Sequence, residues 1–93
     1  MPSPNAVFRA LADPTRRRIL QLLREGPRNS GEIAAQFPVT WATVSRHLAV
    51  LKEAGLVVTE RNGTGIIYEL NTTVLEDLVQ QLLSWTDNGE NNA

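Results

Sequence analysis

The spacing of apolar residues predicts a series of short helices in the first part of the chain. Asn5 is placed to cap a first helix, and Asp13 to cap a second one, with Pro14 at the first helical position, where its missing N–H is not needed. Gly26 and Pro27 end that second helix. The apolar sides of the two helices consist of Val7, Phe8 and Leu11 in the first and of Ile19, Leu22 and Leu23 in the second.

Another pair of helices follows, joined by a tight connection. Asn29 or Ser30 caps the first of this pair, which is about two turns long, and Glu32 closes a capping box on Asn29. Thr40 then caps a longer helix over residues 41–54. The apolar sides consist of Ile33, Ala34 and Phe37 in the shorter helix and of Val44, Leu48 and Leu51 in the longer one. The polar residues of the longer helix are therefore expected on its flanks and outer face.

Beyond residue 55 the pattern changes from helical spacing to that of strands. Residues 56–61 and 66–70 are rich in β-branched side chains, and residues 62–65 have the composition of a turn, so we expect a β-hairpin. Thr73 and Glu76 form a second capping box at the start of a last helix. The wide apolar stripe of that helix consists of Leu75, Leu78, Val79, Leu82 and Leu83, and Trp85 extends it.

The composition fits one small globular domain. The chain has 93 residues, 42% of them hydrophobic and 20% charged, and we expect a single domain over 1–93, with its core in 5–86 and a fraying end at 87–93. A chain of this length buries only about 60–65% of its unfolded surface, which favours a partner subunit. We see neither an apolar stretch of about 20 residues nor a secretory signal, so the expected compartment is the cytoplasm.

The residue types present exclude several kinds of chemistry. The chain has no cysteine and only one histidine, His47, so disulfides, thiol nucleophiles, thiolate metal sites and histidine-rich metal sites are ruled out. The sequence shows no nucleophile paired with a base, no carboxylate pair of defined geometry and no phosphate-binding glycine loop, so we do not expect an enzyme. We expect no metal and no other cofactor.

Charge is divided unevenly along the chain, although the net charge is only −1. Residues 1–55 carry eight positive side chains against four negative ones, whereas residues 56–93 carry one against six. Such a division suggests that one part of the molecule meets a polyanion while the other is kept away from it. The pI of about 5.7 argues against indiscriminate binding to nucleic acid.

The predicted order of elements is that of a winged helix-turn-helix domain, a mainly α fold with a β-hairpin (α+β). The major groove of B-DNA admits one α-helix, and the first turns of that helix contact base edges while neighbouring loops contact phosphates. The partner predicted from this order is double-stranded DNA. The residues that we expect to contact it are Arg28, Thr40, Trp41, Thr43, Ser45, Arg46, His47, Arg61 and Thr64.

Several of these side chains have chemically defined roles. Arg46 is able to bond guanine O6 and N7 in a bidentate manner, and Thr43 and Ser45 are able to bond bases or phosphates. A lone histidine is more often a surface or packing residue, but for His47 we favour donation to a phosphate oxygen, because it lies at the right helical turn. Arg61, near the tip of the hairpin, would enter the neighbouring minor groove.

Two interpretations stay open for Trp41 and for Arg28. Trp41 either packs on the second helix as a local hydrophobic lid, or lies near DNA, where its ring stacks on a sugar or touches a thymine methyl group. Arg28 either docks a phosphate near the start of the third helix or is a solvated loop residue. For Arg16 we predict a structural role, paired with a carboxylate, because the successive arginines 16–18 point in different directions.

Two segments also resemble a known family. Asp13-Pro14-Thr15-Arg16-Arg17-Arg18-Ile19-Leu20 and the block from Val44 to Val57 are similar to the ArsR (arsenic-repressor-like) family of winged-helix transcriptional repressors. Asn71-Thr72-Thr73-Val74-Leu75 and the short acidic tail are similar to its sporulation-delay autorepressor branch. The resemblance implies a homodimer built from the first and last helices. The expected interface residues are Val7, Phe8, Leu11, Leu75, Leu78, Val79, Leu82 and Trp85.

The sequence departs from the metal-sensing members of the family that it resembles. Residues 32–37 contain no cysteine pair, and the last helix contains no histidine, so the ligands of the family's metal sites are missing. The leading hypothesis is therefore a homodimeric repressor that reads an inverted-repeat operator in its own operon without sensing a metal, and that a protein partner releases. The alternatives are a winged-helix protein-interaction module that does not bind DNA, and a repressor gated by a small molecule.

Overall fold

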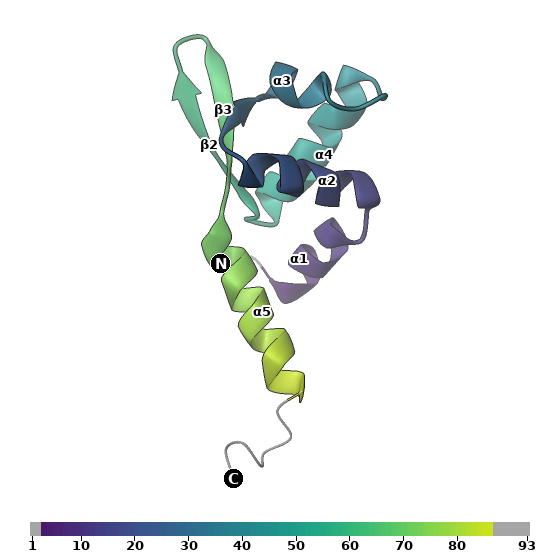
Figure 1. Cartoon of the computed structure of the whole chain (residues 1–93), viewed down its shortest axis with the longest axis vertical. Coiled ribbons are helices and arrows are strands. Elements are labelled where there is room, and N and C mark those ends of the chain that lie inside the picture. Colours follow the sequence, from purple (N-terminus) through teal and green to yellow (C-terminus); the bar gives the residue numbers. More distant parts are fainter. Residues whose placement is uncertain (1–2, 87–93) are drawn as a thin grey trace.

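Five helices and a three-stranded antiparallel sheet make up residues 3–86, the part of the chain that the computed structural model describes (Figure 1). The predicted winged helix-turn-helix order is confirmed, with one additional strand. In chain order the elements are α1 (Pro4–Leu11), α2 (Pro14–Arg24), β1 (Arg28–Asn29), α3 (Ser30–Ala34), α4 (Trp41–Glu53), β2 (Val57–Asn62), β3 (Gly65–Leu70) and α5 (Thr72–Thr86). The expected fraying end at 87–93 lies outside the described residues.

The caps predicted for α2, α3 and α4 are confirmed. The side chains of Asp13, Asn29 and Thr40 each accept a hydrogen bond from the backbone N–H three residues on, at 3.0, 2.8 and 3.1 Å. The capping box on α3 is complete, because Glu32 also accepts from the backbone N–H of Asn29 at 2.9 Å. These bonds set where α2, α3 and α4 begin.

The predicted starts of the first and last helices were wrong by one or two residues. Ser3, and not Asn5, caps α1, because its Oγ accepts from the backbone N–H of Ala6 at 3.1 Å and Pro4 occupies the first helical position. At the other end, α5 begins at Thr72, so Thr73 lies inside its first turn. Asn71, the residue before α5, donates from its side chain to the carbonyl of Gly55 at 2.9 Å.

The hairpin pairs β2 with β3 from Val57 opposite Leu70 to Asn62 opposite Gly65. Its turn therefore consists of Gly63 and Thr64, and Gly63 has a φ of 62°, a conformation that favours glycine. The sheet order is β1-β3-β2, because β1 pairs with the edge of β3 that does not face β2. We did not predict β1, since two residues are too few to show a period of two.

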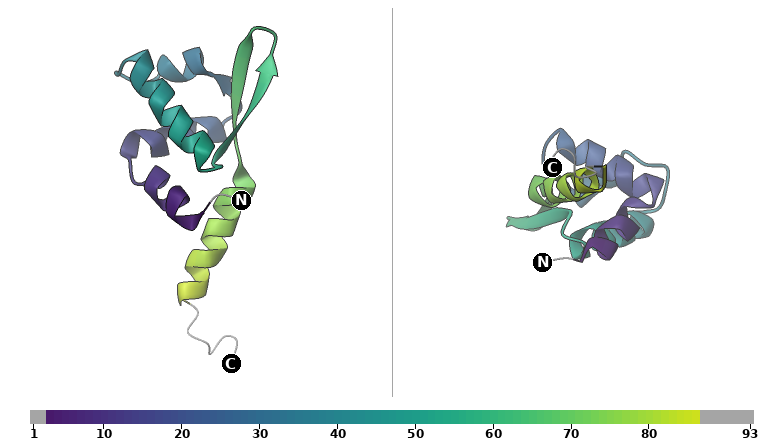
Figure 2. Two further views of the ribbon diagram at one scale, coloured as in Figure 1. Left: turned by 180° about the vertical axis from the view of Figure 1, so that it is seen from behind. Right: turned by 90° about the horizontal axis from the view of Figure 1, so that it is seen from below.

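The core lies where α2, α3 and α4 meet the base of the hairpin. Its largest fully buried side chains are Ile19, Ile33, Val44, Leu48, Leu51, Leu56 and Val57. In contrast, α5 extends away from this core, with α1 packed beside its first turns (Figures 1 and 2). Leu78 is the one residue of α5 that is buried in the described structure. None of the helices in residues 3–86 is long and apolar enough to cross a membrane.

Candidate nucleic-acid interface

Helix α4 is attached to the core by one face and exposed on the other. Val44, Leu48 and Leu51 are each no more than 1% exposed, as their spacing predicted. The residues exposed on the other side of the helix include Ser45 and Arg46, which lie between the buried positions in sequence. The start of α4 and the tip of the hairpin both lie at the end of the molecule opposite α5, and two views agree on this (Figures 1 and 2).

The side chains of Ser45 and Arg46 are free to meet a ligand. Both residues are exposed, and within residues 3–86 neither side chain takes part in a hydrogen bond or ion pair of the chain. The hydroxyl of Thr43 is different, since it lies 3.0 Å from the hydroxyl of Thr40 at the helix cap. The polar groups ready for base contact are therefore those of Ser45 and Arg46, one turn into the helix.

Trp41 is the first residue of α4 and keeps 58% of its surface exposed. The end of its six-membered ring lies over Gly31 of α3, where an added Cβ would stand 3.5 Å from the ring. Trp41 therefore approaches α3, and its packing against α2 stays a prediction. Trp41 is both held against its own chain and open to solvent, which the two sequence interpretations treated as alternatives.

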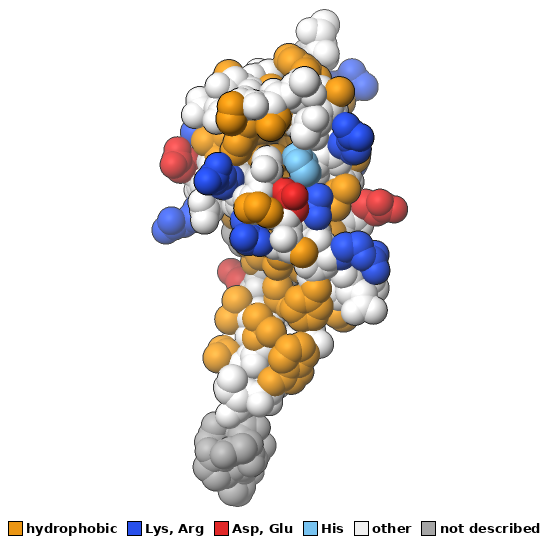
Figure 3. Space-filling model, turned by 90° about the vertical axis from the view of Figure 1, so that its right-hand side faces the viewer, with side chains coloured by type: hydrophobic (Ala, Val, Ile, Leu, Met, Phe, Trp, Pro, Cys, Tyr) orange, Lys and Arg blue, Asp and Glu red, His pale blue; other side chains and the backbone are white. Residues whose placement is uncertain are grey.

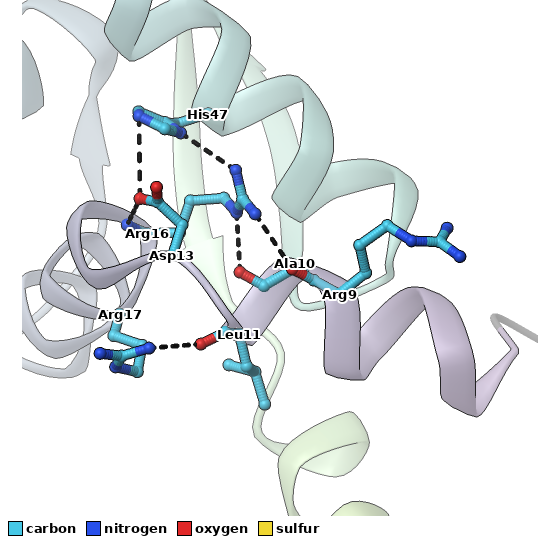
Figure 4. Close-up of polar contacts among 7 residues, drawn as sticks. All are labelled: Arg9, Ala10, Leu11, Asp13, Arg16, Arg17 and His47. Carbon is cyan, nitrogen blue, oxygen red and sulfur yellow. Dashed lines mark hydrogen bonds and ion pairs between the residues drawn. The ribbon is translucent and has the colours of Figure 1, made fainter.

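His47 faces the start of α2, and its side chain is only 17% exposed. Its Nδ1 lies 3.3 Å from Nη1 of Arg16, and its Nε2 lies 3.9 Å from the carboxylate of Asp13 (Figure 4). Both ring nitrogens thus have partners at the start of α2. The phosphate contact predicted for His47 stays a prediction, and in this position the ring ties α4 to α2.

Arg16 has the structural role predicted for it, but its main partners are carbonyl groups. Its Nε donates to the carbonyl of Ala10 at 2.7 Å, and its Nη2 donates to the carbonyl of Arg9 at 3.0 Å. Arg17 similarly donates to the carbonyl of Leu11 at 2.7 Å (Figure 4). These carbonyls belong to the last turn of α1, where helical N–H partners run out, although that of Arg9 also accepts from the cap N–H of Ala12 at 3.2 Å. The predicted carboxylate partner was wrong, because a guanidinium satisfies several such carbonyls at once.

Asp13 is electrostatically coupled to the same corner. The backbone N–H of Arg16 bonds the Asp13 carboxylate and holds the pKa of that group below its usual value, assisted by the nearby His47 and by the Arg16 charge. Partial burial opposes this shift. The ionised form of Asp13 is therefore the one that the fold favours.

The remaining predicted contact residues lie on the sheet. Arg28 is in β1, and its Nη2 lies 3.3 Å from the Glu25 carboxylate, so part of its charge is already paired. Arg61 is in β2 and Thr64 in the hairpin turn, and both are exposed. The structure thus separates the predicted set into the α4 residues, the hairpin residues and Arg28.

An apolar surface covers α1 and α5 at the other end of the molecule. Phe8 of α1 and Trp85 of α5 are stacked, with ring centroids 6.1 Å apart. Val7 and Leu78 are buried within the single chain, whereas most of the stripe on α5 is open. In Figure 3 the hydrophobic side chains gather over this lower part of the molecule, and Lys and Arg side chains gather above it. The exposed apolar residues of α5 are Val79, Leu82, Leu83 and Trp85.

Leu83 belongs to this exposed set but is missing from the predicted interface residues. The helical period places it in the apolar stripe of the last helix, four positions after Val79, although it is left out of the expected interface. An open groove of about 360 Å³ lies beside Val79, between α5, the end of α2 and β3. Within residues 3–86, no cluster of three or more His, Asp or Glu side chains is arranged to hold a metal ion.

Comparison with known proteins gives consistent results. The family described as "Bacterial regulatory protein, arsR family" matches residues 13–59. The chain is 43% identical to the transcriptional repressor SdpR of Bacillus subtilis (strain 168), over 95% of this chain and 98% of that protein.

Solved structures agree with this match. An ArsR-like transcriptional regulator from Rhodococcus sp. RHA1 has a TM-score of 0.84 and 27% identity, covering 95% of this chain and 83% of that one. A homodimeric winged helix-turn-helix DNA-binding domain from Mycobacterium bovis, solved by NMR, has a TM-score of 0.73 and 31% identity, covering 94% of this chain and 82% of that one.

Proposed function

The chain belongs to the ArsR family of bacterial regulatory proteins, and we propose that it is a sequence-specific transcriptional repressor that binds duplex DNA as a homodimer. One observation carries the proposal: Ser45 and Arg46 stand exposed on α4 without a partner among residues 3–86, while Val44 and Leu48 hold that helix on the core. A helix attached by one face and free on the other is the element that fits a major groove.

The contacts divide between base recognition and backbone attachment. We assign base contacts to Arg46 and Ser45, because their side chains have donors and acceptors available. Arg61 and Thr64 extend the contact from the hairpin to the flanking backbone or minor groove. We assign His47 a positioning role, since it links α4 to the start of α2.

The apolar surface over α1 and α5 supports the homodimer. Large apolar side chains that are 39 to 63% exposed are costly in water, and a second copy of the same surface would cover them about a two-fold axis. The related domain from Mycobacterium bovis is described as homodimeric. A two-fold dimer places two copies of α4 about one helical turn of DNA apart, about 34–36 Å, so the operator is an inverted repeat.

We also propose that a metal ion is not the signal. The chain has no cysteine, and its one histidine is engaged by Arg16 and lies near Asp13. The resemblance of residues 71–75 to the sporulation-delay autorepressor branch of the family makes the chain's own operon the first candidate for its operator, with a protein partner as the proposed releasing signal. Added Zn²⁺ should leave the affinity for DNA unchanged, and a fall in affinity that a chelator reverses would refute this part of the proposal.

The test is a fluorescence-anisotropy titration of the full chain against a duplex from the region upstream of its own gene and against a scrambled duplex, at two salt concentrations. Selective binding at both concentrations is expected, because base contacts discriminate sequences while phosphate contacts carry most of the salt dependence. Equal, weak binding that vanishes with salt would contradict a sequence-specific regulator of its own operon.

Two variants with the same change of charge make the test residue-specific. Arg46→Ala should weaken binding to the selected duplex about ten-fold or more, consistent with about 1–3 kcal/mol for a bidentate base contact. Arg24→Ala is the matched control, because Arg24 is exposed at the end of α2, beside the groove along α5. An equal loss in both variants would show that only total charge matters.

A further inference from the structure

Trp41 is exposed at the point where α4 begins, and nothing in the proposed function so far requires an aromatic residue there. More than half of its surface is open to solvent, at 58%. A bound surface that covers this side chain would remove apolar area from water, which is favourable. The question is which surface does so.

The ring is held in place before any ligand arrives. Two carbons of its six-membered ring, Cη2 and Cζ3, lie 3.5 and 3.7 Å from the position that a Cβ on Gly31 would take. Gly31 itself has no side chain, so the ring lies beside the backbone of α3 with room for about one methyl group between them. The Thr40 cap fixes the backbone on the other side of Trp41, with the N–H of Thr43 bonded at 3.1 Å. A ring ordered in this way loses little conformational entropy on binding.

The neighbours of Trp41 indicate what it faces. Ser45, one turn along the helix, and Arg46 next to it present the free polar groups of the same exposed part of α4. These groups suit the hydrogen-bonding edges of bases. In the major groove the thymine 5-methyl group is the apolar feature of the base edges, and an apolar side chain is its matching partner.

We propose that the Trp41 ring, supported by Gly31, reads the 5-methyl group of one thymine in each half-site of the operator. This inference rests on the proposed function and names a base that the site selects. Arg46 and Ser45 read hydrogen-bonding groups, whereas Trp41 reads the presence of a methyl group. The indole N–H is not needed for this contact, so another apolar residue of similar reach would preserve part of it.

The experiment begins with selection of the operator from a randomised duplex pool by the full wild-type chain. In the selected duplex, each thymine of one half-site is then replaced in turn by deoxyuridine, which removes only the methyl group. Dissociation constants are measured for the wild type and for Trp41→Ala. At one thymine the wild type should lose about four-fold in affinity, the value of one buried methyl group, and Trp41→Ala should lose nothing further. The non-additivity of the two changes identifies the contact.

Matched variants exclude indirect effects. Val58→Ala removes another exposed apolar side chain, on the hairpin, and should keep the full four-fold discrimination. Trp41→Phe should keep part of it. Thermal unfolding checks that each variant is folded, and if Trp41→Ala is not, Trp41→Gln, which has a polar side chain, takes its place.

Three results would overturn the inference, and they differ in what they leave standing. If the wild type and Trp41→Ala lose the same factor at every deoxyuridine, another residue reads the methyl group. If Trp41→Ala weakens binding but no deoxyuridine does, the ring contacts the sugar-phosphate backbone. In both cases the proposed function survives. If the wild type enriches no sequence from the pool, the proposed function fails together with the inference.

Discussion

Nη1 of Arg16 lies 3.3 Å from Nδ1 of His47, so a guanidinium of α2 contacts an imidazole on the side of α4 that faces α2 (Figure 4). A guanidinium has donors only, so the contact is a hydrogen bond when Nδ1 accepts, which leaves a proton on Nε2, the nitrogen directed at Asp13. The same Arg16 closes the end of α1 through two carbonyls. One side chain therefore joins three helices.

Arg16→Lys should destabilise the fold by about 1–3 kcal/mol, because an ammonium group cannot reach Ala10, Arg9 and His47 together and leaves partly buried acceptors unpaired. Urea unfolding measures this as a lower midpoint. Arg18→Lys is the control, since Arg18 is exposed and makes no hydrogen bond or ion pair within residues 3–86. Equal midpoints for the two variants would show that the Arg16 contacts contribute nothing to stability.

Asp13 makes the free energy of unfolding depend on pH in the acid range. Its folded-state pKa is lowered, chiefly by the hydrogen bond from the Arg16 backbone and then by His47 and the Arg16 charge, against the opposing effect of burial. Its contribution is therefore present above the unfolded pKa of about 3.9 and is lost as the pH falls through the lower, folded pKa.

Asp13→Asn should flatten this acid dependence, since asparagine keeps the cap without the charge. The free energy of unfolding at pH 7 and at pH values below 4 gives the comparison. Asp77→Asn, an exposed residue of α5, should retain the wild-type slope. An unchanged slope in Asp13→Asn would mean that other carboxyl groups control the acid limb.

The apolar face of α5 predicts where the dimer can be broken. Leu83→Asp places a charge among Val79, Leu82 and Trp85, and two-fold symmetry doubles its effect, so the dissociation constant of the dimer should rise about a hundred-fold or more. Sedimentation equilibrium measures it. Ser84→Asp introduces the same charge at the next position, away from the stripe, and should leave the dimer intact. A monomeric wild type would refute the homodimer, whereas equal dissociation by both changes would place the interface elsewhere.

Local signals in the sequence predicted most of the elements, and contacts between elements account for most of what it missed. The caps of α2, α3 and α4 depend on residues three apart, and the buried face of α4 depends on spacing alone, so both could be read directly. The inward position of His47 was also readable, because it lies three residues after Val44 and four before Leu51.

The missed features depend on tertiary proximity. Nothing local indicates that the two residues of β1 would pair with β3. The carbonyls that Arg16 bonds are six and seven residues away and become its partners only through the turn between α1 and α2. The support that Gly31 gives to Trp41 likewise requires α3 and α4 to be packed together, ten positions apart in sequence. Such contacts follow from the assembled fold and not from any window of the chain.

Gly31→Ala tests that support in the absence of DNA, through the stability of the free protein. The position is helical and its φ is not positive, and an added Cβ would stand 3.4 Å from Oδ1 of Asn29 and 3.5 Å from the Trp41 ring, both ordinary van der Waals distances. Alanine is favoured over glycine within helices, so the free energy of unfolding should rise by about 0.5–1 kcal/mol. Thermal or urea unfolding measures the change.

The same substitution should change how strongly acrylamide quenches the fluorescence of Trp41. In a Trp85→Phe background Trp41 is the one tryptophan of the chain, and phenylalanine keeps an aromatic ring against Phe8. The added methyl group covers more of the Trp41 ring, so acrylamide should quench its fluorescence less in Gly31→Ala. Gly65→Ala is the control, because its Cβ would meet only the backbone oxygen of Asn62, at 3.7 Å. Identical quenching in both variants would mean that the Trp41 ring does not rest on α3, and the ordered ring that the thymine contact relies on would be lost with it.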